Sequence, residues 1–186
     1  MKKTVKAYAK INLHLDVTGI REDGYHSVET VMQSLSLCDD VSISLREDGV
    51  ISCACNIPEL PTDERNIAVR AARAYLEAIN SDKGAFIRIE KRIPMAAGLA
   101  GGSADAAATL VALNELFDNA LSESELLAIG SSLGADVPFC ISCGTHYSDG
   151  RGDILHDFPQ LDKNAVFVVA CGGEGVSTPW GYKLLD

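Results

Sequence analysis

Alternating apolar and polar residues predict a β-strand close to the N-terminus, over residues 5–17. The apolar positions are Ile11, Leu13, Leu15 and Val17, and the polar positions between them are Lys10, Asn12, His14 and Asp16. Because side chains alternate between the two faces of a strand, the pattern predicts that the apolar set is buried. The polar set either faces solvent or lines a cleft, and the pattern leaves both open.

Further apolar runs predict additional strands separated by turn residues. The run over residues 28–45 is interrupted at Cys38-Asp39-Asp40, which we interpret as a break. A hairpin is predicted over residues 144–158, around Asp149-Gly150. The remaining predicted strands cover residues 50–55, 86–92 and 165–170.

Three helices are predicted from apolar periodicity and capping residues. Asn66 caps a helix that continues to about residue 79, and a second, alanine-rich helix covers residues 103–117 with Ser103 as its N-cap. Ser122 and Glu125 form a capping box for the third helix, which ends at Gly134. Ser177 or Thr178 is predicted to cap a further helix at the end of the chain.

The stretch from Pro94 to Asp105 joins a predicted strand to the alanine-rich helix and is the strongest candidate for a binding loop. Its glycines and alanines leave little side chain in the way, so backbone N–H groups can converge on a ligand. The positive end of the following helix favours an anion there, most commonly phosphate. Neither the dinucleotide nor the P-loop spacing fits. A flexible connector is the alternative interpretation.

Asp136 stands between the end of a predicted helix and the strand-like run over residues 137–143. A carboxylate near a helix C-terminus is electrostatically unfavourable, which makes this residue a candidate for function. An ordinary turn aspartate is the alternative. Tyr25 and His26 follow the turn Arg21-Glu22-Asp23-Gly24 and are either a binding corner or the packed start of a strand.

Composition and charge narrow the classes of partner. With 186 residues, 47% of them hydrophobic, the chain can bury a real core. Its net charge of -10 disfavours nucleic acid and anionic membranes as general partners. There is no apolar run of membrane-spanning length and no secretory signal, so we expect a cytoplasmic protein. The sequence does not indicate an oligomeric state.

Six cysteines are present, and in a cytoplasmic protein we expect them to be reduced. Cys53-x-Cys55 and Cys140-x-x-Cys143 offer a possible zinc site. Both pairs lie in apolar stretches, however, where free cysteine behaves as a small hydrophobic residue. We therefore favour buried thiols over a metal site.

Several segments together resemble the GHMP small-molecule kinases. They are Ala9-Lys10-Ile11-Asn12-Leu13, Arg21 to His26, Ile93 to Ala108 and Gly134-Ala135-Asp136-Val137-Pro138-Phe139, with Val176-Ser177-Thr178 resembling the entry to a second domain. The resemblance implies an α+β fold, the GHMP-kinase N-terminal domain related to domain 2 of ribosomal protein S5, with a mixed sheet packed with helices. It also implies that residues 1–175 form the ATP-binding domain and that residues 176–186 begin a C-terminal domain that is otherwise absent.

The same resemblance implies a reaction and roles for individual residues. Asp-Gly-Tyr-His with Gly-Ala-Asp-Val-Pro-Phe is similar to the family member that phosphorylates a cytidine diphosphate-linked methylerythritol in isoprenoid precursor synthesis, using ATP and Mg²⁺. Lys10 and Asp136 would be the catalytic pair, while Asn12, Tyr25 and His26 would hold the substrate. Ser103 is a possible ligand of the magnesium ion. The loop that would bind ATP comprises Pro94, Met95, Ala96, Ala97, Gly98, Leu99, Ala100, Gly101, Gly102, Ser103 and Ala104.

Three alternatives remain beside this interpretation. The chain could be another GHMP kinase, acting on homoserine, mevalonate or a sugar, a truncated non-catalytic module, or an S5-like RNA binder, which the acidic balance disfavours. Ala100 and Ala104 stand where the family usually has Gly and Ser. The methyl group of Ala100 would be strained if its φ is positive, and the loop would then be an imperfect copy.

Overall fold

The structure is a computed structural model that describes residues 1–172 and residue 181. Six strands form one sheet in the order β3-β4-β2-β5-β6, with β1 paired to the other edge of β2. The strands are β1 (Lys2–Ile20), β2 (His26–Arg46), β3 (Ile51–Cys55), β4 (Gly84–Glu90), β5 (Thr145–Asp149) and β6 (Ile154–Asp157). The pair β3–β4 is parallel and all other pairs are antiparallel, so the sheet is mixed as predicted.

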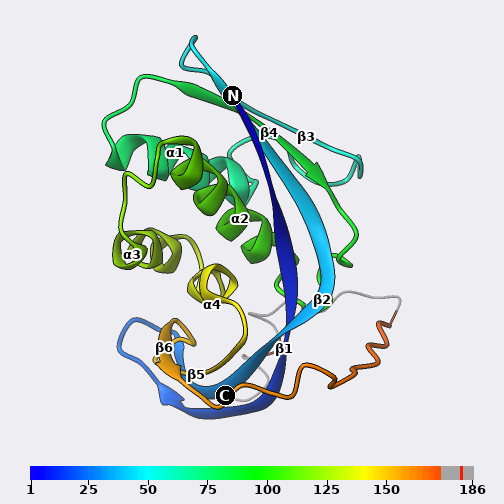
Figure 1. Ribbon diagram of the computed structural model, residues 1–186. Coiled ribbons are helices and arrows are strands. Elements are labelled where there is room, and N and C mark those ends of the chain that lie inside the picture. Colours follow the sequence, from blue (N-terminus) through cyan, green and yellow to red (C-terminus); the bar gives the residue numbers. More distant parts are fainter. Residues whose placement is uncertain (173–180, 182–186) are drawn as a thin grey trace.

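Four helices lie together on one side of the long strands (Figure 1). They are α1 (Ile67–Ala78), α2 (Gly101–Leu116), α3 (Glu123–Leu133) and α4 (Val137–Ser142). Asn66 accepts a hydrogen bond from the Ala68 N–H, and the Ser122–Glu125 capping box is present, so both predicted caps are confirmed.

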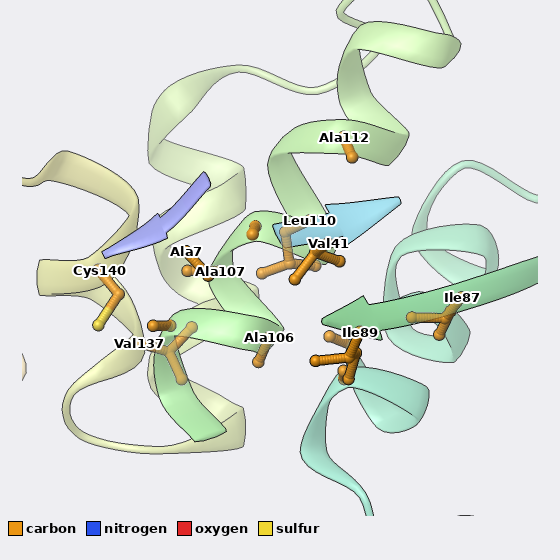
Figure 2. Close-up of a cluster of buried hydrophobic side chains, with 14 of the residues drawn as sticks. Ala7, Val41, Ile87, Ile89, Ala106, Ala107, Leu110, Ala112, Val137 and Cys140 are labelled. Atoms are coloured by element: carbon orange, nitrogen blue, oxygen red, sulfur yellow. The ribbon is translucent and has the colours of Figure 1, made fainter. Parts of the chain in front are cut away.

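The core lies between α2 and the sheet. Most of α2 is buried on all sides, because its alanines let it approach β1, β2 and α1 closely. Figure 2 shows alanines of α2 and Leu110 next to Val41 of β2 and Ile89 of β4. The tight packing fixes the position of the first turn of α2, from which the preceding loop emerges.

Irregularities in the pairing of β1 with β2 change which side chains of β1 are buried. The registers Tyr8↔Cys38 and Lys10↔Ser34, then Asn12↔Met32 and His14↔Val31, show irregularities that break strict alternation. Lys10 is consequently buried, whereas Leu13 and Leu15 are 43% and 50% exposed. The prediction of an apolar buried face from residue 11 to residue 17 is therefore wrong.

Three other predicted elements differ in the structure. Asp39 does not break the strand, because its buried carboxylate is bound by Lys91 inside a continuous β2. Residues 137–142 form helix α4 instead of a strand. Residues 165–170 pair with no strand in the described chain, so their backbone groups lack the partner edge that a strand requires. Val176, Ser177 and Thr178 lie outside the described residues.

Within the part of the chain described here, no helix is long and apolar enough to cross a membrane.

Candidate functional site

One large cavity, with a volume of about 1320 Å³, brings together residues far apart in the sequence. Of the residues predicted for the site, Lys10, Asn12, Tyr25, His26, Asp136 and all of residues 94–103 line it. Ala104 does not, because its methyl group is buried in the core and its N–H donates to the Ala100 carbonyl.

Lys10 connects β1 to the glycine-rich loop and to Asp136. Its backbone N–H donates to the Leu99 carbonyl at 3.1 Å, and its Nζ donates to Asn12 Oδ1 at 2.7 Å. The same Nζ lies 3.8 Å from Asp136 Oδ1. The Lys10 side chain is only 9% exposed, whereas that of Asp136 is 37% exposed, so the carboxylate remains accessible from the cavity.

Asp136 occupies the N-cap position of α4, in the turn that follows α3. Its side chain caps no backbone N–H of that helix. Asp136 follows the C-terminus of α3, as predicted, but it also stands at the N-terminus of α4, where a carboxylate is electrostatically favourable. The side chain is nevertheless directed to Lys10 instead of the helix, which leaves it available for chemistry.

The glycine-rich loop alternates left-handed residues. Ala96, Gly98 and Ala100 have φ values of 53°, 73° and 55°, which confirms the strain expected at Ala100. Ala100 is also the N-cap of α2, so the prediction of Ser103 as N-cap is wrong. Because alanine has no capping oxygen and the first turn of α2 has no acidic residue, the first N–H groups of the helix open onto the cavity without a side-chain acceptor.

This loop fits an anionic ligand. A Cβ built on Gly98 would meet nothing within 4 Å, so there is open space where the backbone turns. Uncapped N–H groups, a helix dipole and that space together form an anion-binding arrangement. Ser103 contributes a hydroxyl to the same wall, on the side of the turn that carries Asp136.

The wall of the cavity extends along β1 to the turn before β2. The bulge at Leu13 places Leu15 and Val17 on the same face as Lys10 and Asn12, so the cavity changes from polar to apolar along β1. The backbone N–H of Tyr25 donates to Asp23 Oδ1 and, with Arg21 nearby, holds the pKa of that carboxyl below its usual value. The turn thereby fixes the backbone of Tyr25, a residue that is 59% exposed.

Thr30 and Arg151 are among the residues of the cavity wall that sequence reasoning missed. The guanidinium carbon of Arg151 lies 5.4 Å from the centre of the Tyr25 ring, and its Nη2 donates to Asp153 Oδ2 at 2.6 Å. Thr30 is buried and binds Asn12. The Asp-Gly turn before Arg151 was a usable signal, because turns after strands often carry binding residues. A lone threonine in an apolar strand gave none.

The cysteines show no sign of a metal centre. All six are free, and the described residues contain no group of three or more His, Cys, Asp or Glu side chains that could hold a metal ion. Burial raises the pKa of Cys53 to about 11 and that of Cys140 well above its ordinary value. Burial therefore favours the neutral thiol, whereas zinc binds the thiolate.

Comparisons with known proteins agree with this architecture. The family model described as GHMP kinases N terminal domain matches residues 66–144. A 4-diphosphocytidyl-2-C-methyl-D-erythritol kinase of Clostridium botulinum (strain Alaska E43 / Type E3) is 47% identical over 98% of this chain, and one of Acetivibrio thermocellus is 48% identical over 98%. The chain spans 64% of the length of each of these relatives.

A solved structure of 4-(cytidine 5'-diphospho)-2C-methyl-D-erythritol kinase is also similar. Its TM-score is 0.69 at 39% sequence identity, covering 84% of this chain and 55% of that one. The mixed sheet, the uncapped α2 and the loop before it thus occur in a chain that matches these kinases in both sequence and fold. In both sequence and fold, the chain matches the N-terminal domain of the GHMP kinases.

Proposed function

We propose that the protein transfers the γ-phosphoryl group of ATP to the 2-hydroxyl of 4-diphosphocytidyl-2-C-methyl-D-erythritol, in the non-mevalonate pathway to isoprenoid precursors. The observation that carries this proposal is the position of Lys10 Nζ, 3.8 Å from Asp136 Oδ1, in the same cavity as the uncapped N-terminus of α2. A reacting pair next to an anion site is what phosphoryl transfer requires.

The loop over residues 94–104 would hold the phosphates of ATP. The N–H groups at the start of α2 would bind phosphate oxygens, and the helix dipole would favour their negative charge. ATP when bound supplies the phosphoryl group that is transferred. Ser103 would contribute its hydroxyl to a magnesium ion that accompanies ATP, since hard cations prefer oxygen ligands.

Asp136 would act on the attacking hydroxyl of the substrate. Its carboxylate, which is accessible from the cavity, can accept the hydroxyl proton and orient the oxygen for attack. The ammonium group of Lys10 would offset negative charge that develops during transfer, in a site where water is partly excluded. Asn12 holds that ammonium group through its Oδ1 and would also contact the substrate.

Tyr25 and His26 would bind the cytosine ring at the other end of the cavity. A flat base needs an aromatic face and a hydrogen-bonding edge, which these two side chains provide. The apolar residues Leu15 and Val17 line the same region and favour a ring over a charged group.

We infer that residues 1–175 form the ATP-binding domain and that a second domain, which begins near residue 176, completes the cleft in the whole protein. The support is that the chain spans 64% of the length of the relatives it matches. The partner that we expect in this cleft is a small molecule.

A phosphorylation assay tests the proposal directly. ATP and the cytidylylated methylerythritol are incubated with this chain and with a form extended through any following reading frame, and mevalonate and homoserine serve as alternative acceptors. Asp136→Asn is expected to abolish turnover while ATP still binds, whereas Asp63→Asn should retain activity, because Asp63 does not line the cavity. No turnover of the cytidylylated substrate by either form refutes the proposed function.

A further inference from the structure

Thr30 is a buried polar residue in the cavity wall for which the reaction above has no role. It lies in β2, is 2% exposed and lines the cavity beside Asn12. Its Oγ1 accepts a hydrogen bond from Asn12 Nδ2 at 2.6 Å and donates one to the His14 carbonyl at 2.7 Å. Thr30 therefore sits between a side chain of the candidate site and the backbone of β1.

Lys10, Asn12, Thr30 and His14 are linked by three successive hydrogen bonds, and the chemistry of these groups determines which partner donates in each. The Lys10 ammonium group can only donate hydrogen bonds, so Asn12 must direct its Oδ1 to Lys10 and its Nδ2 to Thr30. The Thr30 hydroxyl must then accept a hydrogen bond from Asn12, and it must donate its own hydrogen bond to a different acceptor. The His14 carbonyl accepts the hydrogen bond that the Thr30 hydroxyl donates, so the Asn12 amide has a single orientation.

The bulge in β1 accounts for the availability of that carbonyl. Asn12 pairs with Met32 and His14 with Val31, so Leu13 is an extra residue without a partner in the ladder. The ladder is locally disrupted there, and the Thr30 hydroxyl bonds to His14 at that point. The bulge and the threonine thus work together to aim Asn12.

We propose that Thr30 is a positioning residue for the phosphoryl transfer: its hydroxyl fixes the Asn12 amide so that Asn12 Oδ1 holds the Lys10 ammonium beside Asp136. This inference rests on the proposed function. Thr30 touches neither Lys10 nor Asp136 through any hydrogen bond in the described structure, and it acts through Asn12. Without its hydroxyl, the Asn12 Nδ2 would face a methyl group and lose its anchor.

Two substitutions separate the hydroxyl from the packing role of Thr30. Thr30→Val keeps the shape and removes the hydroxyl, whereas Thr30→Ser keeps the hydroxyl and removes a methyl group. Positioning predicts a fall in kcat of about tenfold for Thr30→Val with KM for ATP unchanged, and near wild-type kcat for Thr30→Ser. A packing role predicts the reverse order. Thr109→Val is the matched control, because Thr109 is also buried and donates to a backbone carbonyl but does not line the cavity.

A second measurement does not depend on turnover. The side-chain amide protons of Asn12, assigned in ¹⁵N spectra with the help of Asn12→Asp, should exchange with solvent at least about tenfold faster in Thr30→Val than in wild type or Thr30→Ser. Unchanged exchange overturns the inference, and so does an unchanged kcat of Thr30→Val when the wild-type protein is active. Absence of turnover by the wild-type protein instead overturns the proposed function and the catalytic part of this inference, while exchange still reports whether Thr30 holds Asn12.

Discussion

Lys91 Nζ donates to Asp105 Oδ2 at 2.8 Å inside the core, directly beneath the glycine-rich loop. The same nitrogen donates to Asp39 Oδ2 at 2.5 Å, and all three side chains are almost fully buried. Lys91 follows β4, Asp39 belongs to β2 and Asp105 to the second turn of α2. This buried triad therefore connects the sheet to the helix whose N-terminus faces the cavity.

The first prediction concerns the pH dependence of stability. Burial raises the pKa of Asp105 to about 7, although Lys91 opposes the shift, so between pH 4 and pH 7 the folded state holds a proton that the unfolded state has released. The contribution of Asp105 to stability therefore falls as pH rises through this range. Asp105→Asn cannot titrate, so its free energy of unfolding relative to wild type should increase by a few kcal/mol between pH 5 and pH 8.

Urea unfolding of both proteins at several pH values measures this difference. Asp39→Asn is the informative comparison, because Asp39 Oδ1 also accepts the backbone N–H groups of Arg92 and Ile93. It should destabilise the protein at every pH, since two backbone donors lose a charged acceptor. A stability difference between Asp105→Asn and wild type that does not change with pH would contradict the assignment of the proton to Asp105.

The second prediction concerns the first two residues of α2. A Cβ on Gly101 would lie 2.8 Å from Lys91 Nζ and 3.0 Å from a methyl group of Ile93, whereas a Cβ on Gly102 would meet only Ile67, at 3.6 Å. Gly101→Ala should therefore lower the free energy of unfolding by about 1–3 kcal/mol, the usual range for overpacking. Gly102→Ala should remain within about 0.5 kcal/mol of wild type. Equal stabilities of the two variants would contradict this prediction and show that the Lys91 side chain can move aside without loss of stability.

The helices were largely predictable from the sequence, and the buried face of β1 was not. Capping residues such as Asn66 and Ser122 bond to backbone groups within a few residues, so they predict a helix start without knowledge of the tertiary structure. The face of a strand depends on its partner, and the bulge at Leu13 arises only in the pairing with β2. Strict alternation therefore assigned Leu13 and Leu15 to the core, where the structure leaves them half exposed.

In the candidate site, too, some residues could be predicted from the sequence and others depend on the tertiary structure. Lys10, Asp136 and the glycine-rich loop were identified by residue type and by resemblance, and the structure brings them to one cavity. Asp39 was misread as a break because a carboxylate in an apolar run is usually exposed, and its partner Lys91 is 52 residues away. Charges that are buried as a pair leave no local pattern, so only the fold reveals them.

The third prediction concerns the backbone of the loop. Ala100 has a φ of 55°, a conformation that costs an L-residue about 1–2 kcal/mol and costs glycine nothing. Glycine loses more chain entropy on folding, so Ala100→Gly should raise the free energy of unfolding by a net amount of about 0.5–1 kcal/mol. Ala97→Gly is the control, because Ala97 is also half-buried but its φ is not positive. It should lower stability by about 0.5–1 kcal/mol in the same thermal or urea unfolding measurement.

The last prediction concerns Arg151, at the end of the cavity that we propose binds the cytosine base. The Arg151 guanidinium covers one face of the Tyr25 ring and is held there by Asp153 and by the Ser131 carbonyl of α3. It restrains the ring on which the proposed cytosine base would stack, and its positive charge would attract the diphosphate of the proposed substrate. Arg151→Leu should therefore weaken the binding of cytidine 5'-diphosphate about tenfold in calorimetric titrations, with ATP affinity unchanged. Arg46→Leu removes an arginine with the same local pairing, to Asp48 two residues on, but away from the cavity, and it should bind like wild type. Equal loss of affinity in both variants would mean that net charge, and not the contact with Tyr25, determines binding.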